Sequence, residues 1–135
     1  MSVIYLKNVL IYKILNKNIY IIYSETFNLG ENQMSNFIKV AIISDLKPGE
    51  NKVVEVNGEQ VALFNVDGEF FAINNTCLHR GGPLGEGFLD GDIVTCPLHG
   101  WRYNVKTGAN LMIPNQKVAA YQVRVEGNDI LVSLE

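Results

Sequence analysis

CLHRGGPLGEG (residues 77–87) and CPLHGWRYNVKTG (residues 96–108) are the two segments that decide how this chain is interpreted. Each segment begins with a cysteine that is followed closely by a histidine, as Cys77-x-His79 and Cys96-x2-His99, and 16 residues separate His79 from Cys96. The 135-residue chain has no other cysteine or histidine. All its thiols and imidazoles therefore fall within one short window.

This spacing is typical of a metal centre. A thiol and an imidazole a few residues apart can bind a metal group from one short loop, and two such loops can meet across it. Glycines that would let the backbone approach such a group closely surround both segments: Gly81, Gly82, Gly85, Gly87 and Gly100. The spacing alone also permits a structural zinc ion. A disulfide between the two cysteines would suit a small secreted domain, and no secretion signal is evident.

The two segments resemble the cluster-binding loops of Rieske ferredoxins and of small Rieske-type subunits, and the similarity extends over about residues 36–135. The resemblance implies one Rieske-type 2Fe–2S cluster and an all-β fold, an antiparallel sandwich or barrel with a two-loop cluster-binding subdomain. It also implies that Cys77 and Cys96 bind a buried iron, while His79 and His99 bind the iron nearer the surface. No catalytic residue is expected.

Two departures from the family predict a low reduction potential. The disulfide of high-potential Rieske proteins is excluded because Gly82 and Leu98 occupy the corresponding positions, and Trp101 stands where those proteins have a serine that bonds a sulfide. Tyr103 matches a tyrosine whose hydroxyl reaches a cysteine sulfur. Since hydrogen bonds to sulfur stabilise the reduced cluster, we expect a potential in the lower part of the Rieske range of roughly −150 to +300 mV.

A third loop is expected over the cluster. In the family a proline-bearing segment covers it, and Leu111, Met112, Ile113 and Pro114 would supply this segment here. A dry cover would shield the cluster and tune its potential. Simple core packing of Leu111 and Ile113 remains an alternative.

The rest of the chain from Met34 onward shows short strands between turns. Strands are predicted at residues 37–43, 52–56, 60–66, 69–73, 92–96, 121–126 and 130–134 from their β-branched residues and alternation. Asn57-Gly58, Asp67-Gly68 and Gly127-Asn128 are hairpin turn signals. Turns spaced by roughly ten residues are typical of a small antiparallel sandwich or barrel.

Residues 1–33 differ in character from residues 34–135, the predicted Rieske domain. They are rich in residues with AT-rich codons, and Lys7, Lys13 and Lys17 interrupt their apolar stretch, which argues against a membrane span. Gly30-Glu31, shortly before Met34, is what a ribosome-binding sequence would encode. We therefore expect an N-terminal extension that is mis-annotated or disordered. A genuine strand or helix packed on the domain is the alternative.

Composition narrows the function further. The net charge is −3 without any Lys/Arg cluster, which makes nucleic acid an unlikely partner and favours, weakly, a basic patch on a redox partner. The chain lacks the GxGxxG and phosphate-loop motifs of nucleotide-binding proteins. It also lacks the further histidines that the mononuclear iron of an oxygenase needs.

The sequence therefore predicts a cytoplasmic ferredoxin, not an enzyme and not membrane-bound. It would pass single electrons from a reductase to an oxygenase or another oxidoreductase. The alternatives are a small Rieske-type subunit of a nitrite reductase-like complex, and a zinc-stabilised binding module, which would be colourless.

Overall fold

The computed structural model describes residues 2–6, 9–13, 19–23 and 36–135, and the chain divides into two units, Met1–Asn36 and Phe37–Glu135. In the first unit, β1 (Ser2–Leu6), β2 (Val9–Lys13) and β3 (Ile19–Tyr23) pair as an antiparallel sheet in the order β1-β2-β3. The prediction for residues 1–33 falls largely outside the described residues and stays a prediction. No helix in the described part of the chain is long and apolar enough to cross a membrane.

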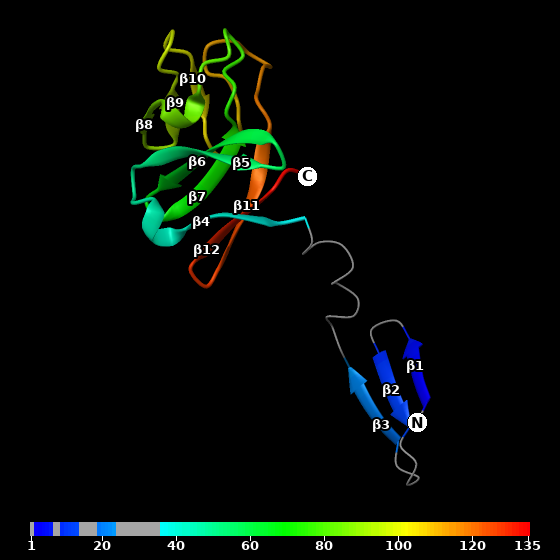
Figure 1. Cartoon of the computed structure of the whole chain (residues 1–135). Coiled ribbons are helices and arrows are strands. Elements are labelled where there is room, and N and C mark those ends of the chain that lie inside the picture. The colour runs from blue at the N-terminus through cyan, green and yellow to red at the C-terminus, as the bar shows by residue number, and fades with distance from the viewer. Residues whose placement is uncertain (1, 7–8, 14–18, 24–35) are drawn as a thin grey trace. The chain divides into compact units, whose positions relative to one another are not determined.

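The second unit is built on a six-stranded antiparallel sheet with the order β4-β12-β11-β7-β6-β5 (Figure 1). Its strands are β4 (Ile38–Ile42), β5 (Asn51–Val56), β6 (Glu59–Val66), β7 (Glu69–Asn74), β11 (Ala120–Glu126) and β12 (Asp129–Ser133). The edge strands β4 and β5 also contact each other, so the sheet curls into a nearly closed barrel. Residues 43–45 form the short 3-10 helix η1 (Ile43–Asp45) between them.

Three of the predicted turns are confirmed by their backbone geometry. Asn57 and Gly58 have φ of 51° and 85°, and Asp67 and Gly68 have φ of 52° and 97°. Positive φ at both central residues is what a type I′ hairpin turn requires, and Asn-Gly and Asp-Gly supply it most readily. Gly127, at the β11–β12 turn, has φ of 60°.

A smaller sheet is inserted between β7 and β11. It consists of β8 (Phe88–Asp90), β9 (Ile93–Thr95) and β10 (Arg102–Asn104), in the order β10-β9-β8, and the 3-10 helix η2 (Leu84–Glu86) precedes it. Figure 1 shows this sheet and its loops at one end of the unit, beyond the barrel. This insertion confirms the predicted loop-bearing subdomain within an antiparallel all-β fold.

The strands β6 and β7 are buried on both faces because a separate hydrophobic core lies on each side of them. Val61, Leu63 and Ala72 belong to the core inside the barrel, whereas Phe64 and Ile73 belong to the core beneath the small sheet. A continuous apolar run, Val61-Ala62-Leu63-Phe64, is what a strand covered on both faces needs. The small sheet thus rests on the buried central part of β6 and β7.

Candidate metal centre

The two predicted loops have the same backbone construction. In the first, the N–H of Cys77 donates to the carbonyl of Gly82 (2.9 Å), and in the second the N–H of Cys96 donates to that of Trp101 (2.7 Å). Gly81 and Gly100, each four residues after a cysteine, donate back to the carbonyl of that cysteine. Both glycines adopt positive φ (75° and 80°), which other residues adopt at a cost. The glycines therefore allow each loop to close on itself.

The structure brings all four predicted ligand residues to the end of the unit. Cys77 and Cys96 are 2% and 3% exposed and form no disulfide. His79 and His99 are exposed, and their ring centroids lie 4.8 Å apart with perpendicular planes. The thiols are thus the inner pair and the imidazoles the outer pair. Their assignment as ligands of an inner and an outer iron stays a prediction.

The surroundings of the cysteines fit a sulfur-ligated group. A Cβ atom added at Gly82 would lie 2.6 Å from the Cys96 Sγ and 3.1 Å from Leu98 Cγ, so only glycine leaves room there. Burial raises the pKa of Cys96, while the backbone N–H groups of Leu98 and His99, directed at its sulfur, act in the opposite direction. N–H groups around a cysteine sulfur stabilise it as a thiolate ligand.

The chemistry of the donor set fits a Rieske cluster. Two thiolates and two imidazoles suit a Rieske centre, in which each iron takes two protein ligands.

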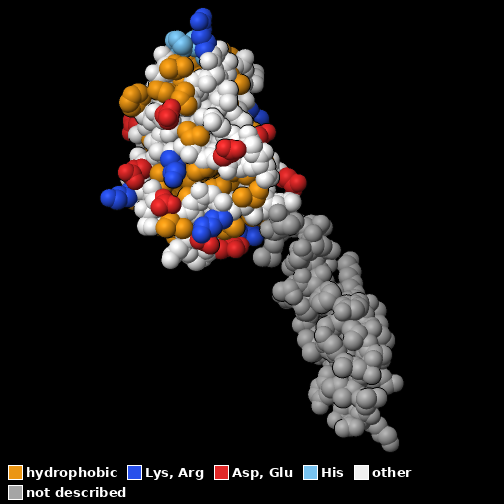
Figure 2. Space-filling model, in the orientation of Figure 1, with side chains coloured by type: hydrophobic (Ala, Val, Ile, Leu, Met, Phe, Trp, Pro, Cys, Tyr) orange, Lys and Arg blue, Asp and Glu red, His pale blue; other side chains and the backbone are white. Residues whose placement is uncertain are grey.

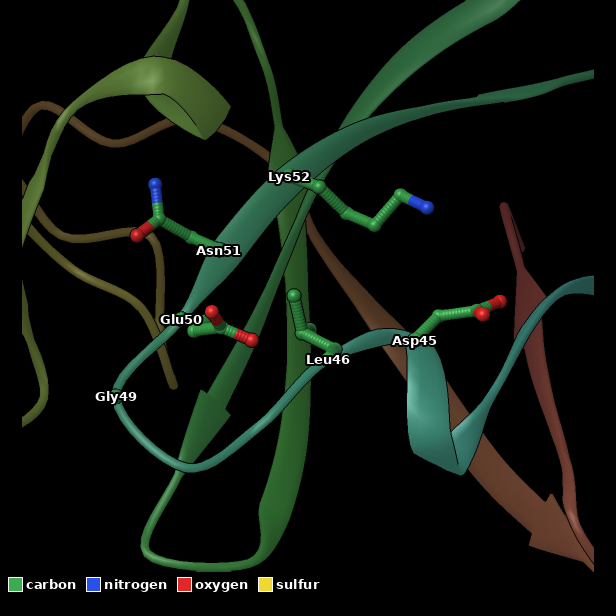
Figure 3. Close-up of a pocket in the computed structure, with 6 residues that line it drawn as sticks. All are labelled: Asp45, Leu46, Gly49, Glu50, Asn51 and Lys52. Carbon is green, nitrogen blue, oxygen red and sulfur yellow. The ribbon is translucent and has the colours of Figure 1, made fainter.

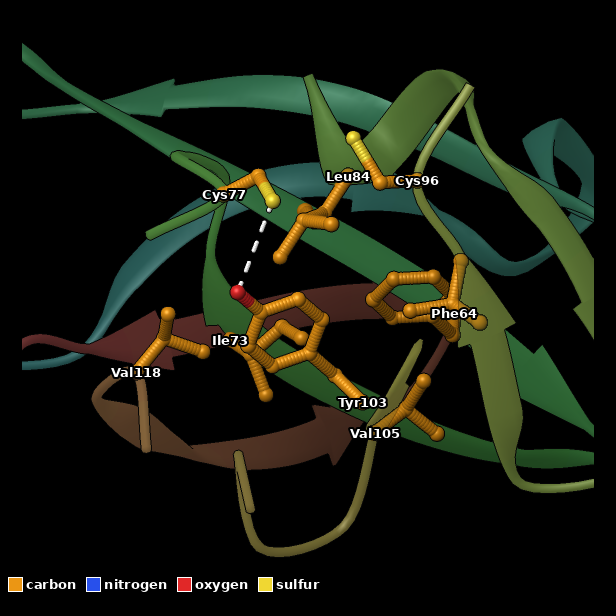
Figure 4. Close-up of a cluster of buried hydrophobic side chains, with 10 residues drawn as sticks. Phe64, Ile73, Cys77, Leu84, Cys96, Tyr103, Val105 and Val118 are labelled. Carbon is orange, nitrogen blue, oxygen red and sulfur yellow. Dashed lines mark hydrogen bonds between the residues drawn. The ribbon is translucent and has the colours of Figure 1, made fainter. Parts of the chain in front are cut away.

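Tyr103 lies beneath the cysteines and is completely buried. Its hydroxyl is 3.4 Å from the Cys77 Sγ and accepts a hydrogen bond from the backbone N–H of Leu78 (3.0 Å). Burial raises the pKa of Tyr103 far above its usual value, and the hydrogen bond to Cys77 adds to this, so the hydroxyl keeps its proton. Figure 4 shows the hydroxyl directed at Cys77, which confirms the predicted contact.

Three residues support the site through contacts that were not predicted: Trp101, Asn75 and Asn51. Trp101 stacks on His79, with ring centroids 4.7 Å apart and an interplanar angle of 17°. Asn75 is buried, and its Oδ1 accepts a hydrogen bond from the N–H of Gly85 (2.7 Å). Asn51, on β5, donates to the carbonyls of Gly85 and Gly87. These asparagines join the first loop to the barrel.

The third loop is only partly as expected. Leu111 and Met112 are 44% and 50% exposed, so core packing of Leu111 is excluded, while Ile113 is partly buried. The loop is held by Asn110, whose Oδ1 accepts hydrogen bonds from the N–H groups of Met112 and Ile113. Its role as a cover of the metal group stays a prediction.

A hollow of the described surface away from the cysteine–histidine loops contains no thiol or imidazole (Figure 3). It is lined by Asp45, Leu46, Gly49, Glu50, Asn51 and Lys52. Its carboxylates serve local turns, because Asp45 accepts from the N–H of Ile42 and Glu50 from that of Lys47. It contains none of the four predicted ligands.

Comparison with known proteins agrees with the geometry. The family model described as the Rieske [2Fe-2S] domain matches residues 36–126. The chain is 37% identical over 101 residues to a ferredoxin component of naphthalene 1,2-dioxygenase/salicylate 5-hydroxylase systems from Ralstonia sp, covering 74% of this chain and 97% of the relative. It is 42% identical over 98 residues to the biphenyl dioxygenase ferredoxin subunit of Pseudomonas sp. (strain KKS102), covering 71% and 90%.

Solved structures give the same result. The ferredoxin of carbazole 1,9a-dioxygenase from Nocardioides aromaticivorans IC177 superposes with a TM-score of 0.69 at 34% identity, covering 74% of this chain and 99% of that one. A ferredoxin in complex with a reduced oxygenase, also of carbazole 1,9a-dioxygenase, has a TM-score of 0.68 at 34% identity, covering 73% and 93%. A protein described as a nitrite reductase small subunit shares the fold, with a TM-score of 0.63 at 24% identity, covering 71% and 96%.

Proposed function

This chain belongs to the Rieske [2Fe-2S] family, and on that premise we propose that it is the ferredoxin component of a dioxygenase system. It carries one Rieske-type cluster and transfers single electrons, and it is not itself the catalytic subunit. Its donor would be a reductase and its acceptor a terminal oxygenase. The observation that supports this most directly is the similarity to ferredoxin components over nearly their whole length.

We propose Cys77 and Cys96 as the ligands of the inner iron, and His79 and His99 as the ligands of the outer iron. The burial of both thiols and the exposure of both imidazoles support this assignment. When bound, the cluster supplies a one-electron couple. Trp101 holds the ring of His79 by stacking, and Tyr103 directs a protonated hydroxyl at Cys77. The exposed imidazoles keep the path to a docked partner short.

The nitrite reductase-like subunit is the weaker alternative. The similarity to such a subunit is one of fold, at 24% identity, whereas ferredoxin components of dioxygenase systems reach 37% and 42%. A cytoplasmic location is likewise proposed, supported by two buried cysteines that form no disulfide. Fractionation of the native source, with detection of this chain in the cytoplasmic fraction, tests the location.

Two measurements test the function. The purified chain should contain two irons and no zinc, and its reduced form should give a rhombic EPR signal with nitrogen couplings from two histidines. It should then replace the native ferredoxin in a naphthalene 1,2-dioxygenase assay with purified reductase and oxygenase, and sustain product formation. The His99→Ala variant should lose both properties. A colourless zinc protein would contradict the cluster, and a stable red protein that co-purifies with a reductase complex would contradict the free carrier.

A further inference from the structure

The charges of this chain are separated along its sequence in a way that the net charge of −3 conceals. Residues 70–85 and 93–125 contain no Asp or Glu at all. These two segments include both cysteine–histidine loops, and they carry five cations: Arg80, Arg102, Lys106, Lys117 and Arg124. The acidic side chains of the second unit all lie outside them.

The fold places Asp90 and Asp92 away from the second cysteine–histidine segment, while Glu86, at the end of η2, is the one acidic residue of the first loop. In the β8–β9 hairpin, Asp90 pairs with Ile93 at the turn, whereas Phe88 pairs with Thr95 at the opposite end, which leads directly into Cys96. Thr95 in turn pairs with Arg102 on β10. Asp90 and Asp92 are therefore at the far end of the small sheet. Arg102 is at the end that bears the second loop.

Two arginines flank the histidine pair. Arg80 directly follows His79, and Arg102 directly follows Trp101, whose indole stacks on His79. Both arginines are exposed. Figure 2 shows Lys or Arg atoms beside histidine atoms at this end of the molecule, and the acidic atoms of that view lie further down.

These arginines are available for a partner. The ion pairs among the described residues are Lys39–Asp129 (3.1 Å) and Arg124–Glu126 (3.5 Å), and neither includes Arg80 or Arg102. An exposed arginine without an internal carboxylate can form a bidentate pair with a carboxylate of another protein.

Exposed apolar side chains accompany them. Leu78 precedes His79 and is 47% exposed, Leu98 precedes His99 and is 55% exposed, and Phe88 is 70% exposed. Phe88, Thr95 and Arg102 pair across the three strands of the small sheet, so their side chains share its outer face. We call Leu78, Arg80, Phe88, Leu98 and Arg102 the cluster-end surface. Apolar residues between arginines are typical of a protein interface.

We propose that the cluster-end surface binds redox partners whose docking face carries carboxylates around an apolar centre. The proposal rests on the proposed electron-carrier function and specifies the partner. It reverses the expectation from the net charge, which favoured a basic partner. The reason is that charges at the rim of an interface govern the association rate, whereas charges further away than a Debye length, about 8–10 Å at physiological salt, are largely screened.

The test uses two protein probes of opposite charge. The full-length, cluster-loaded chain is reduced and mixed in a stopped-flow instrument with cytochrome b5, an acidic haem protein, or with cytochrome c, a basic one. Between about 0.01 M and about 0.15 M ionic strength the Debye length falls from about 30 Å to about 8 Å. We expect the rate constant with cytochrome b5 to fall severalfold over this range, and that with cytochrome c to stay level or rise.

Charge-reversal variants locate the effect. Arg80→Glu with Arg102→Glu should invert both salt dependences. The control variant, Lys39→Glu with Lys47→Glu, changes the net charge by the same amount at exposed positions outside the cluster-end surface. It should leave the salt dependence of both rate constants nearly unchanged. The proposal is overturned if the wild-type chain reacts with cytochrome c at a rate that salt depresses, or if both pairs of substitutions act equally. Neither reaction involves an oxygenase, so failure in the dioxygenase assay would not be mistaken for failure here.

Discussion

The hydroxyl of Tyr103 has two hydrogen-bonding neighbours, the sulfur of Cys77 and the N–H of Leu78. Because its oxygen accepts from Leu78, its proton is left for the sulfur. We expect Tyr103→Phe to lower the reduction potential, since a lost hydrogen bond to sulfur destabilises the reduced cluster. A loss of about 1.4 kcal/mol corresponds to about 60 mV for a one-electron couple. Redox titration followed by EPR measures the shift.

Tyr121 provides the matched control. Its hydroxyl accepts from Asn74 Nδ2 and donates to Glu59, and it contacts no cysteine. Tyr121→Phe removes a phenolic hydroxyl in the same way and should leave the potential unchanged. Equal shifts in the two variants would mean that Tyr103 acts through the fold rather than through the sulfur.

At the residue scale, the sequence was sufficient to predict those site residues that follow one another at short, fixed spacings in the chain. Cys77, His79, Cys96 and His99 could be proposed because each cysteine–histidine pair is only a few residues apart, and Tyr103 by its distance from His99. The stacking of Trp101 on His79 could not, because it depends on how closely two separate loops approach. The role of Asn75 was hidden for the same reason.

Among the elements, the first loop depends on Asn75 for its attachment to the barrel. Asn75→Ala would leave the N–H of Gly85 buried without a partner, which costs about 1–3 kcal/mol. We expect a lower melting temperature and faster loss of the visible spectrum in the presence of an iron chelator. Calorimetry and chelator-challenge kinetics measure the two effects.

Asn65→Ala separates the fold from the metal site. Asn65 is as buried as Asn75, and it accepts from Gly68 and donates to the carbonyl of Leu46, in a part of the barrel without predicted ligands. This variant should lose similar stability and keep the wild-type rate of iron loss below its melting temperature. If it loses iron as fast as Asn75→Ala, cluster retention follows global stability alone.

The elements differed in how well they could be predicted. The six barrel strands were anticipated to within one or two residues, because each has five or more residues and a clear turn beside it. β9 was also predicted, whereas β8 and β10 were not. The three residues of β9, Ile-Val-Thr, are all β-branched, whereas β8 and β10 contain no β-branched residue, and pairing with β9 holds them in place.

For the whole molecule, residues 1–33 should be dispensable. The family model matches residues 36–126, and the dioxygenase ferredoxins match 74% of this chain over 97% and 99% of their own lengths. A chain that begins at Met34 should therefore fold, bind the cluster and keep the reduction potential of the full chain. Expression of both forms, with EPR and thermal melting, makes the comparison. A shifted EPR spectrum or a lower melting temperature would instead support the packed N-terminal strand.

The net charge could not predict the docking surface, because it adds up all charged residues and does not say where each of them lies in the fold. In the sequence, nothing marks residues 70–85 and 93–125 as parts of one surface. The fold brings the loops of these two segments to the same end of the unit. The stacking of Trp101 on His79 brings the segment that contains Arg102 to the loop that contains Arg80.

The insertion between β7 and β11 has a consequence for how this protein can be engineered. Ala120 pairs with Ile73 in the barrel, and the N–H of Asn74 donates to the carbonyl of Ala119 (2.8 Å), so residues 75–119 leave and re-enter the sheet at adjacent points. Because its two ends are adjacent, this segment can connect two neighbouring antiparallel strands in the same way as a hairpin turn does. The redox module can thus be treated as a transplantable cassette for any antiparallel strand pair that presents a comparable apolar face.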